Sequence, residues 1–268
     1  MYLIYNGKVV NNSSPCINPN SEGLLYGYGL FETLKVHKDN IYFFDEHIDR
    51  LRAGCKVLGL NFNTEPSALL KYCYQLLDAN QLSNCALRIT YFKSDTQCNY
   101  IITSRNNPYT RDDYNKGFKL CFTNLRRNPK SILVSVKTNN YLENMLVRSE
   151  AKQKGFDETV FLNTYNKISE GTTSNIFFVK NNKLFTPSSE CGILPGIIRG
   201  KVIEISKKLG VSIEIGHYVR EELLNADEIF ITNSLLDIMP VSQIETKNLD
   251  IGKLCITQLL KEELKKLY

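Results

Sequence analysis

The sequence predicts an α+β fold with two domains. Segments in which polar and apolar residues alternate, as in strands, are interspersed with segments whose apolar residues recur every three or four positions, as in helices. The chain has 268 residues, which is long enough for two domains with cores of their own. A polar stretch that contains a proline, residues 124–131, predicts the linker between a first domain over 1–123 and a second over 132–268.

The first domain is predicted to start with a hairpin, because Asn6-Gly7 interrupts two short apolar runs. A loop follows over 11–22. Asp45 is placed to cap a helix, and Ile48 and Leu51 begin its apolar face. The strands are expected at 2–10, 30–36, 41–44, 86–93, 98–104 and 117–123, and the helices at 46–58 and 65–79.

The second domain shows the same mixture of patterns. Gly155 and Gly210 each follow a helical pattern and are expected to end it. The helices are expected at 140–154, 197–209 and from 251 onward. The strands are expected at 132–136, 158–163, 175–180, 183–186, 211–219 and 228–232.

Composition excludes several classes of protein. The net charge of +5 is spread along the chain, which argues against a nucleic-acid-binding protein. The eight cysteines form no Cys-x-x-Cys pair, and the three histidines do not cluster, so no metal site is expected. No segment resembles a signal peptide or a membrane span. These features predict a cytoplasmic protein.

Three motifs together carry the parts of a pyridoxal-phosphate site. Lys137, at the end of an apolar run, has an amine that can form a Schiff base with an aldehyde. Glu170, in Ile-Ser-Glu-Gly, can pair with a pyridinium nitrogen. Gly196 opens a helix whose first N–H groups can bind phosphate. Each feature alone has a simpler explanation: a solvated lysine, an exposed carboxylate and a turn.

Two further side chains could join such a site. Arg50 lies three residues after His47, off the apolar face of its helix, and could grip a phosphate instead of lying on the surface. Tyr141, four residues after Lys137, could donate a hydrogen bond to the cofactor instead of filling the core.

These motifs resemble the class IV aminotransferases, the fold type IV pyridoxal-phosphate enzymes. The family includes branched-chain and D-amino acid aminotransferases and 4-amino-4-deoxychorismate lyase. The resemblance extends from Tyr26 to Val241 and includes Tyr-Gly-Tyr-Gly-Leu-Phe-Glu-Thr (26–33), Glu-His-Ile-Asp-Arg-Leu (46–51), Lys-Thr-Asn-Asn-Tyr-Leu-Glu-Asn (137–144), Glu-Gly-Thr-Thr-Ser-Asn-Ile-Phe (170–177) and Gly-Ile-Leu-Pro-Gly-Ile-Ile-Arg (192–199). It implies a D-amino acid aminotransferase-like fold with a pseudo-barrel in the second domain, and a homodimer.

The resemblance also implies roles for individual residues. Lys137 is the expected catalytic residue, which binds the aldehyde and carries the proton. The expected contacts to pyridoxal 5'-phosphate come from Arg50, Lys137, Tyr141, Glu170, Leu194, Ile197, Ile198, Asn233 and Ser234. Phe31 and Lys93 are expected to contact the substrate.

Three positions depart from the family pattern. Tyr28 replaces the aspartate of Tyr-Gly-Asp-Gly, and Ile198 replaces a threonine, so that only its N–H can reach the phosphate. Lys93 stands where D-amino acid aminotransferases and the lyase have an arginine that binds a substrate carboxylate. A lysine supplies charge without the planar two-point grip.

The sequence therefore predicts an aminotransferase that acts on an amino acid. The alternative within the family is 4-amino-4-deoxychorismate lyase, which releases pyruvate and 4-aminobenzoate from aminodeoxychorismate for folate synthesis. A remote alternative is a binding module that keeps the fold without catalysis. The substrate is expected to be a small molecule in every enzymatic case.

Overall fold

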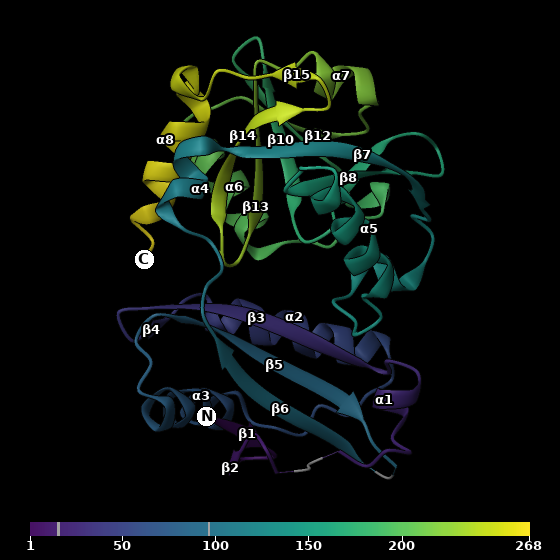
Figure 1. Ribbon diagram of the computed structural model, residues 1–268, viewed down its shortest axis with the longest axis vertical. Helices are drawn as coiled ribbons and strands as arrows, with labels where there is room; N and C mark the ends of the chain where they lie inside the picture. Colours follow the sequence, from purple (N-terminus) through teal and green to yellow (C-terminus); the bar gives the residue numbers. More distant parts are fainter. Residues whose placement is uncertain (15–16, 96) are drawn as a thin grey trace. The chain divides into compact units, whose positions relative to one another are not determined.

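The computed structural model describes residues 1–14, 17–95 and 97–268 (Figure 1). Pro15 and Cys16, in the predicted loop over 11–22, lie outside the described residues. The chain forms two compact units: the first comprises residues 1–108 and 136–140, and the second residues 109–135 and 141–268. The linker predicted at 124–131 lies within the second unit, where residues 124–127 complete strand β7.

The first unit is a six-stranded sheet in the order β2-β1-β6-β5-β3-β4. Its elements are β1 (Tyr2–Tyr5), β2 (Lys8–Asn11), α1 (Glu22–Leu25), β3 (Gly29–His37), β4 (Asn40–Ile41), α2 (Phe44–Val57), α3 (Pro66–Asn80), β5 (Cys85–Lys93) and β6 (Cys98–Arg105). Leu34 of β3 and Leu87 of β5 are register partners, and both pack in one core with Ile48 of α2 and Leu69 of α3. The two long helices therefore cover the same face of this sheet.

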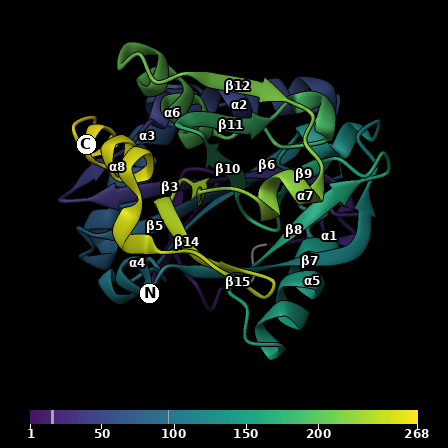
Figure 2. The same cartoon turned by 90° about the horizontal axis from the view of Figure 1, so that it is seen from above.

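The second unit contains nine strands: β7 (Phe118–Arg127), β8 (Glu158–Asn163), β9 (Ile168–Gly171), β10 (Asn175–Lys180), β11 (Lys183–Pro187), β12 (Ile213–Gly216), β13 (Glu228–Asn233), β14 (Asp237–Ile244) and β15 (Lys247–Asn248). The strand order is β12-β11-β10-β13-β14-β7-β8-β9, with β15 paired to β14. Because β9 also contacts β10 and β11, the sheet curves back on itself, as Figure 2 shows from above.

Helices of the second unit surround this curved sheet. They are α4 (Arg111–Lys116), α5 (Leu142–Gln153), α6 (Ile197–Lys208), α7 (Arg220–Leu224) and α8 (Cys255–Lys265), with 3₁₀ turns η1 (Ile132–Ser135), η2 (Ser189–Cys191) and η3 (Ile251–Lys253). The predicted α+β class is confirmed. Within the described part of the chain, no helix has the length and apolar character needed to cross a bilayer.

Two predicted strands are wrong. Residues 132–136 form η1 instead, with Ile132 and Leu133 exposed, and the chain pairs with a strand only after it. The strand expected at 41–44 is cut short because Phe43 adopts a left-handed conformation, with φ of 55°, and α2 begins at the next residue. Asp45 therefore lies in the first turn of α2 and is not its cap.

Three strands were absent from the prediction: β9, β14 and the two-residue β15. β9 is only four residues long, and its carboxylate and glycine suggest a loop. β14 contains Pro240, which argues against an interior strand, since proline cannot donate to the sheet. Nevertheless Pro240 pairs with Phe230 of β13, and β14 joins β13 to β7.

Candidate active site

Lys137 is held in the first unit by backbone pairing with β3. Phe31 N–H donates to the Lys137 carbonyl at 2.9 Å, and Asn139 N–H donates to the Gly29 carbonyl at 2.9 Å. Thr138 forms an antiparallel bridge with Leu30 between them. The segment 137–139 thus pairs with the edge of β3, and this pairing places the half-buried Lys137 beside the start of that strand.

Phe31 lies on the face of the sheet opposite α2 and α3. The Lys137 amine lies 4.4 Å from the centre of the Phe31 ring. The Arg88 guanidinium lies over the same ring at 3.7 Å, and its Nε donates to the Thr90 hydroxyl at 3.2 Å. Phe31 pairs with Thr90 in register, and Arg88 lies two residues before Thr90, so Phe31, Arg88 and Thr90 share one face of the sheet. The amine of Lys137 and the guanidinium of Arg88 therefore both lie close to the Phe31 ring.

Lys93 lies on the other face of β5, because its position differs from Arg88 by an odd number of residues. Its amine pairs with the Glu22 carboxylate at 2.8 Å and lies 5.1 Å from the Tyr28 ring. The hydrogen bond with Glu22 raises the pKa of Lys93. The predicted substrate contact at Lys93 therefore has a carboxylate partner within the chain, and Arg88 shares a face with Phe31.

Arg50 is oriented by a carboxylate that the sequence analysis did not single out. Arg50 Nε donates to Glu32 Oε1 at 2.8 Å, and a terminal nitrogen donates to Oε2 at 2.6 Å. His47 Nδ1 lies 2.7 Å from the same Oε2. Glu32 and His47 are fully buried, whereas the Arg50 side chain is 14% exposed. The two-point pair fixes the plane of the guanidinium.

The charges in this cluster perturb one another. Burial raises the pKa of Glu32, but the charge and hydrogen bonds of Arg50, with those of His47, outweigh it and lower the pKa to about 2. Burial lowers the pKa of His47, and together with the charges of Arg50 and Lys137 it outweighs the hydrogen bond and charge of Glu32, which raise it. Glu32 is therefore an anion and His47 a neutral donor at physiological pH.

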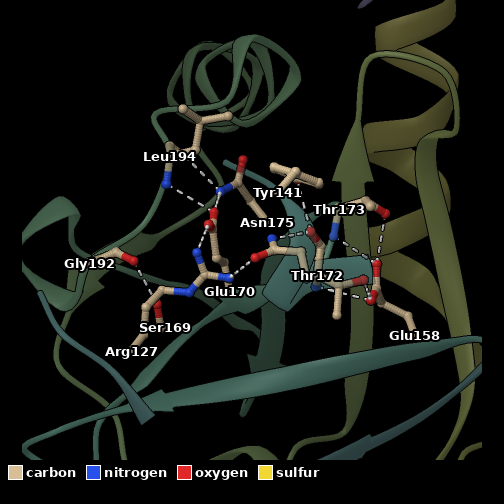
Figure 3. A network of polar contacts seen from close by, with 11 residues as sticks. Arg127, Tyr141, Glu158, Ser169, Glu170, Thr172, Thr173, Asn175, Gly192 and Leu194 are labelled. Carbon is tan, nitrogen blue, oxygen red and sulfur yellow. Dashed lines mark hydrogen bonds and ion pairs between the residues drawn. The ribbon is translucent and has the colours of Figure 1, made fainter. Parts of the chain in front are cut away.

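Glu170 is the centre of a polar network in the second unit (Figure 3). Its Oε2 accepts hydrogen bonds from Asn175 Nδ2 at 3.0 Å and from the Leu194 backbone N–H at 2.9 Å. Its Oε1 lies 3.5 Å from a terminal nitrogen of Arg127, whose guanidinium stacks over the Phe161 ring at 4.3 Å. Two hydrogen-bond donors and a cation therefore surround this nearly buried carboxylate.

A second buried carboxylate shapes the turn that follows Glu170. Glu158 accepts hydrogen bonds from the backbone N–H groups and the hydroxyls of Thr172 and Thr173 (Figure 3). It also accepts from the Ser174 hydroxyl at 3.2 Å. On the other side of the turn, the Thr172 carbonyl accepts from Tyr141 Oη at 2.9 Å and from Asn144 at 2.6 Å. Glu158 thereby fixes the backbone between Glu170 and Asn175.

Tyr141 differs from its predicted setting in one respect. It precedes α5 as the N-cap residue and lies outside the helix itself. Burial raises the pKa of Tyr141, as do the charges of Glu170 and Glu158, so the phenol stays protonated. In this arrangement its hydrogen points at Thr172, and the predicted donation to a cofactor oxygen would compete with that bond.

The start of α6 provides backbone donors. Gly196 is the N-cap residue, and no side chain caps the helix. A Cβ at Gly196 would lie 2.0 Å from Asn175 Oδ1, so only glycine allows Asn175 to bridge Glu170 and the Leu194 carbonyl. The N–H groups of Ile197 and Ile198, in the first turn, have no partner within the helix itself.

Asn233 and Ser234 lie where β13 turns into β14. Asn233 Oδ1 accepts from the backbone N–H groups of Leu235 and Leu236, both at 2.9 Å, and Nδ2 donates to the Thr173 carbonyl at 3.1 Å. The Asn233 side chain therefore builds the turn and joins it to the 171–174 turn. Ser234, which follows it, is only partly buried.

The donor set in the second unit suits a group with a basic ring nitrogen and a phosphate. An ionised carboxylate can accept from a protonated ring nitrogen, and an uncapped helix start can bind a dianion. Leu194 links this carboxylate to the helix start, since its N–H donates to Glu170 and the backbone continues through Pro195 to Gly196. The first unit supplies an amine at Lys137 and an oriented guanidinium at Arg50. Among the described residues, no group of three or more metal-binding side chains occurs.

Four residues at these clusters escaped the sequence analysis: Glu32, Arg88, Arg127 and Glu158. Arg127 lies in the polar stretch that suggested a linker, and Glu158 begins an otherwise apolar strand. Only Glu32 and Arg88 carried a usable signal, because strand alternation places Glu32 among core positions and Arg88 on the face of Phe31.

Comparisons with known proteins show which family this chain resembles. The family model for amino-transferase class IV matches residues 29–244. The aminodeoxychorismate lyase of Bacillus subtilis is 30% identical over 264 residues, covering 92% of this chain and 88% of that protein. A putative branched-chain-amino-acid aminotransferase of Methanocaldococcus jannaschii is 30% identical over 280 residues, covering 99% and 96%. The structure of branched-chain amino acid aminotransferase from Escherichia coli matches with a TM-score of 0.91 at 26% identity, covering 100% of this chain and 94% of that one.

Proposed function

Because this chain belongs to the class IV aminotransferase family, as its motifs predict, we propose that it is an aminotransferase that acts on an amino acid through Lys137. Enzymes of this family use pyridoxal 5'-phosphate. When bound, the cofactor supplies an aldehyde that takes up amines and a ring that accepts electrons from the substrate α-carbon. The single observation that carries the proposal is the Glu170 network.

Glu170 is the proposed partner of the cofactor ring nitrogen. Asn175 and the Leu194 N–H hold one carboxylate oxygen, and Arg127 lies beside the other. These contacts keep Glu170 ionised, and an ionised acid at that position keeps a pyridine nitrogen protonated. Leu194 is proposed to pack against the ring.

The phosphate is proposed to bind at three places. The N–H groups of Ile197 and Ile198 offer the positive end of the α6 dipole. Ser234 offers a second contact from the turn between β13 and β14, and the side chain of Asn233 supports that turn. Arg50 offers a guanidinium whose plane is set by Glu32.

Lys137 is proposed to hold the cofactor and then to carry the proton. Its amine lies against the Phe31 ring, which shields it from water on that side. With the cofactor bound, the amine of Lys137 would act as the general base that removes the substrate α-proton and would then deliver that proton to C4′ of the cofactor. Tyr141 is proposed to contact the cofactor.

Arg88 is proposed to be the cation that binds the carboxylate group of the substrate. It stacks on Phe31, as Lys137 does, whereas Lys93 pairs with Glu22 on the opposite face of β5. A guanidinium can bind a carboxylate through two parallel hydrogen bonds, which the lysine cannot do.

A homodimer is the proposed assembly. Leu142, Met145 and Leu146 of α5 lie on one helical stripe and are 71%, 52% and 61% exposed, which is a surface that a second copy could cover. Light scattering of the purified protein tests it, and a monomer at micromolar concentration would contradict it.

A second candidate is 4-amino-4-deoxychorismate lyase. The similarity to the Bacillus subtilis lyase, at 30% identity over most of both chains, favours it. Lyase and aminotransferase would share the same lysine and acid, and they differ in whether carbanion formation is followed by loss of pyruvate or by amine transfer.

The experiment that decides between them is a substrate panel. The purified protein, reconstituted with pyridoxal phosphate, is incubated with amino acids of both chiralities plus 2-oxoglutarate, and separately with aminodeoxychorismate. We expect keto-acid exchange in the first assay. Pyruvate from aminodeoxychorismate without any exchange would replace the aminotransferase by the lyase. No near-visible absorption after reconstitution would leave only a non-catalytic binding module.

A further inference from the structure

Helix α8 packs against the hairpin of β13 and β14 (Figure 1). It is also hydrogen-bonded to this hairpin near both ends. At its start, the buried Glu228 of β13 accepts from the backbone N–H groups of Ile256 at 3.1 Å and Thr257 at 2.8 Å. Just beyond its end, the Tyr268 hydroxyl donates to the Asp237 carboxylate, at the start of β14. Between these points, Leu260 and Leu264 are fully buried.

The hairpin turn itself, residues 233–237, is held by further hydrogen bonds. Asn233 Oδ1 binds the N–H groups of Leu235 and Leu236 from inside the turn. Tyr114 of α4 donates its hydroxyl to the Leu236 carbonyl at 2.8 Å from outside. Asp237 adopts a left-handed conformation, with φ of 57°, which aspartate tolerates better than most residues other than glycine and asparagine.

The contacts around this turn set its conformation. Here the determinants come from two separate elements, α4 and the segment after α8, and both act through a phenol. Burial raises the pKa of Tyr114, and the charge of Asp237 raises it further, so this hydroxyl remains a donor.

We propose that Tyr268 and Tyr114 are positioning residues that pin the 233–237 turn so that Ser234 is presented to the cofactor phosphate. The inference rests on the proposed function, because it takes the phosphate site from there. Neither tyrosine touches the cofactor: each acts on Ser234 through Asp237 or Leu236. The first turn of α6 keeps its own place without them, so the loss of a phenol weakens the phosphate site without abolishing it.

The test compares two ligands that differ only in the phosphate. Equilibrium binding of pyridoxal 5'-phosphate and of pyridoxal is measured by absorption in the wild-type protein and in Tyr268→Phe, Tyr114→Phe and Tyr218→Phe. Tyr218 is the matched control, since its hydroxyl donates to Glu214 in β12 at 3.1 Å and not to the turn. Each phenylalanine removes one hydroxyl and nothing else.

We expect Tyr268→Phe and Tyr114→Phe to weaken binding of pyridoxal phosphate about tenfold each, the loss of one hydrogen bond of ordinary strength, and to change pyridoxal affinity by less than about twofold. Tyr218→Phe should change neither. The ratio of the two affinities also separates positioning from lost stability, because a merely destabilised protein would lose both ligands in proportion.

Two results would overturn the inference: unchanged affinity for pyridoxal phosphate in both turn variants, or an equal loss for both ligands. If the wild-type protein binds neither ligand, the proposed function fails and the inference fails with it. If the wild-type protein binds both and the ratio does not move in the variants, only the inference fails.

Discussion

Glu32→Gln tests the charge cluster that orients Arg50. The substitution keeps the shape of the side chain but replaces an anion by a neutral amide. The environment lowers the pKa of Glu32 from 4.5 to about 2, which corresponds to about 3 kcal/mol in favour of the charged form at about 1.36 kcal/mol per pKa unit. A cost of this size is expected when one partner of a buried ion pair is removed.

The assay is urea denaturation followed by far-ultraviolet circular dichroism, with each transition fitted separately because the chain has two units. We expect Glu32→Gln to lower the free energy of unfolding of the first unit by about 3 kcal/mol at pH 7. The control is Glu22→Gln in the same unit, which removes a half-exposed carboxylate paired with Lys93. Glu22→Gln should lower the free energy of unfolding by much less than Glu32→Gln does.

The pH dependence gives a second readout. Because the pKa of Glu32 is lower in the folded state, its contribution is complete above the unfolded value of about 4.5 and is lost as the pH falls toward about 2. The difference between wild type and Glu32→Gln should therefore stay constant from pH 8 to about pH 5 and narrow below it. A loss below about 1 kcal/mol at pH 7, or one equal to that of Glu22→Gln, would refute the assignment.

Other predictions follow from the two units. Arg88→Lys should raise KM for a carboxylate substrate at least about tenfold, because a two-point contact is lost. Lys93→Ala should change KM little, because Lys93 pairs with Glu22. Steady-state kinetics measure both variants, and a larger effect of Lys93→Ala would make Lys93 the cation that binds the substrate. Glu158→Gln should release the 171–174 turn, so that amide hydrogen exchange at Thr172 and Thr173 accelerates while that of β11 stays unchanged. Unaltered protection at both threonines would contradict the role given to Glu158.

Much of the fold could be predicted because periodicity is strong in long segments. The hairpin at Asn6-Gly7, helix α2 and the strands β5 and β6 all lie within about two residues of expectation. Each failure has its own physical cause. Pro240 has no backbone N–H to donate, so the sequence of β14 does not indicate an interior strand. Phe43 adopts a left-handed conformation that no local pattern indicates.

The candidate site divides in the same way. Lys137, Glu170 and Gly196 could be named from motifs because their chemistry depends on residue type and order. Glu158 could not, since its function in the fold depends on a turn that lies fourteen residues further along the chain. Arg127 could not either, because a polar stretch before Pro129 predicts a linker whether or not one of its side chains meets a carboxylate.

The central claim is that the amine of Lys137 binds the aldehyde of the cofactor. The most direct measurement is borohydride reduction of the reconstituted protein, followed by proteolysis and mass spectrometry of the peptides. The account predicts a phosphopyridoxyl group on Lys137, and none at that peptide in Lys137→Ala. A modified lysine elsewhere, or no modified peptide at all, would contradict it.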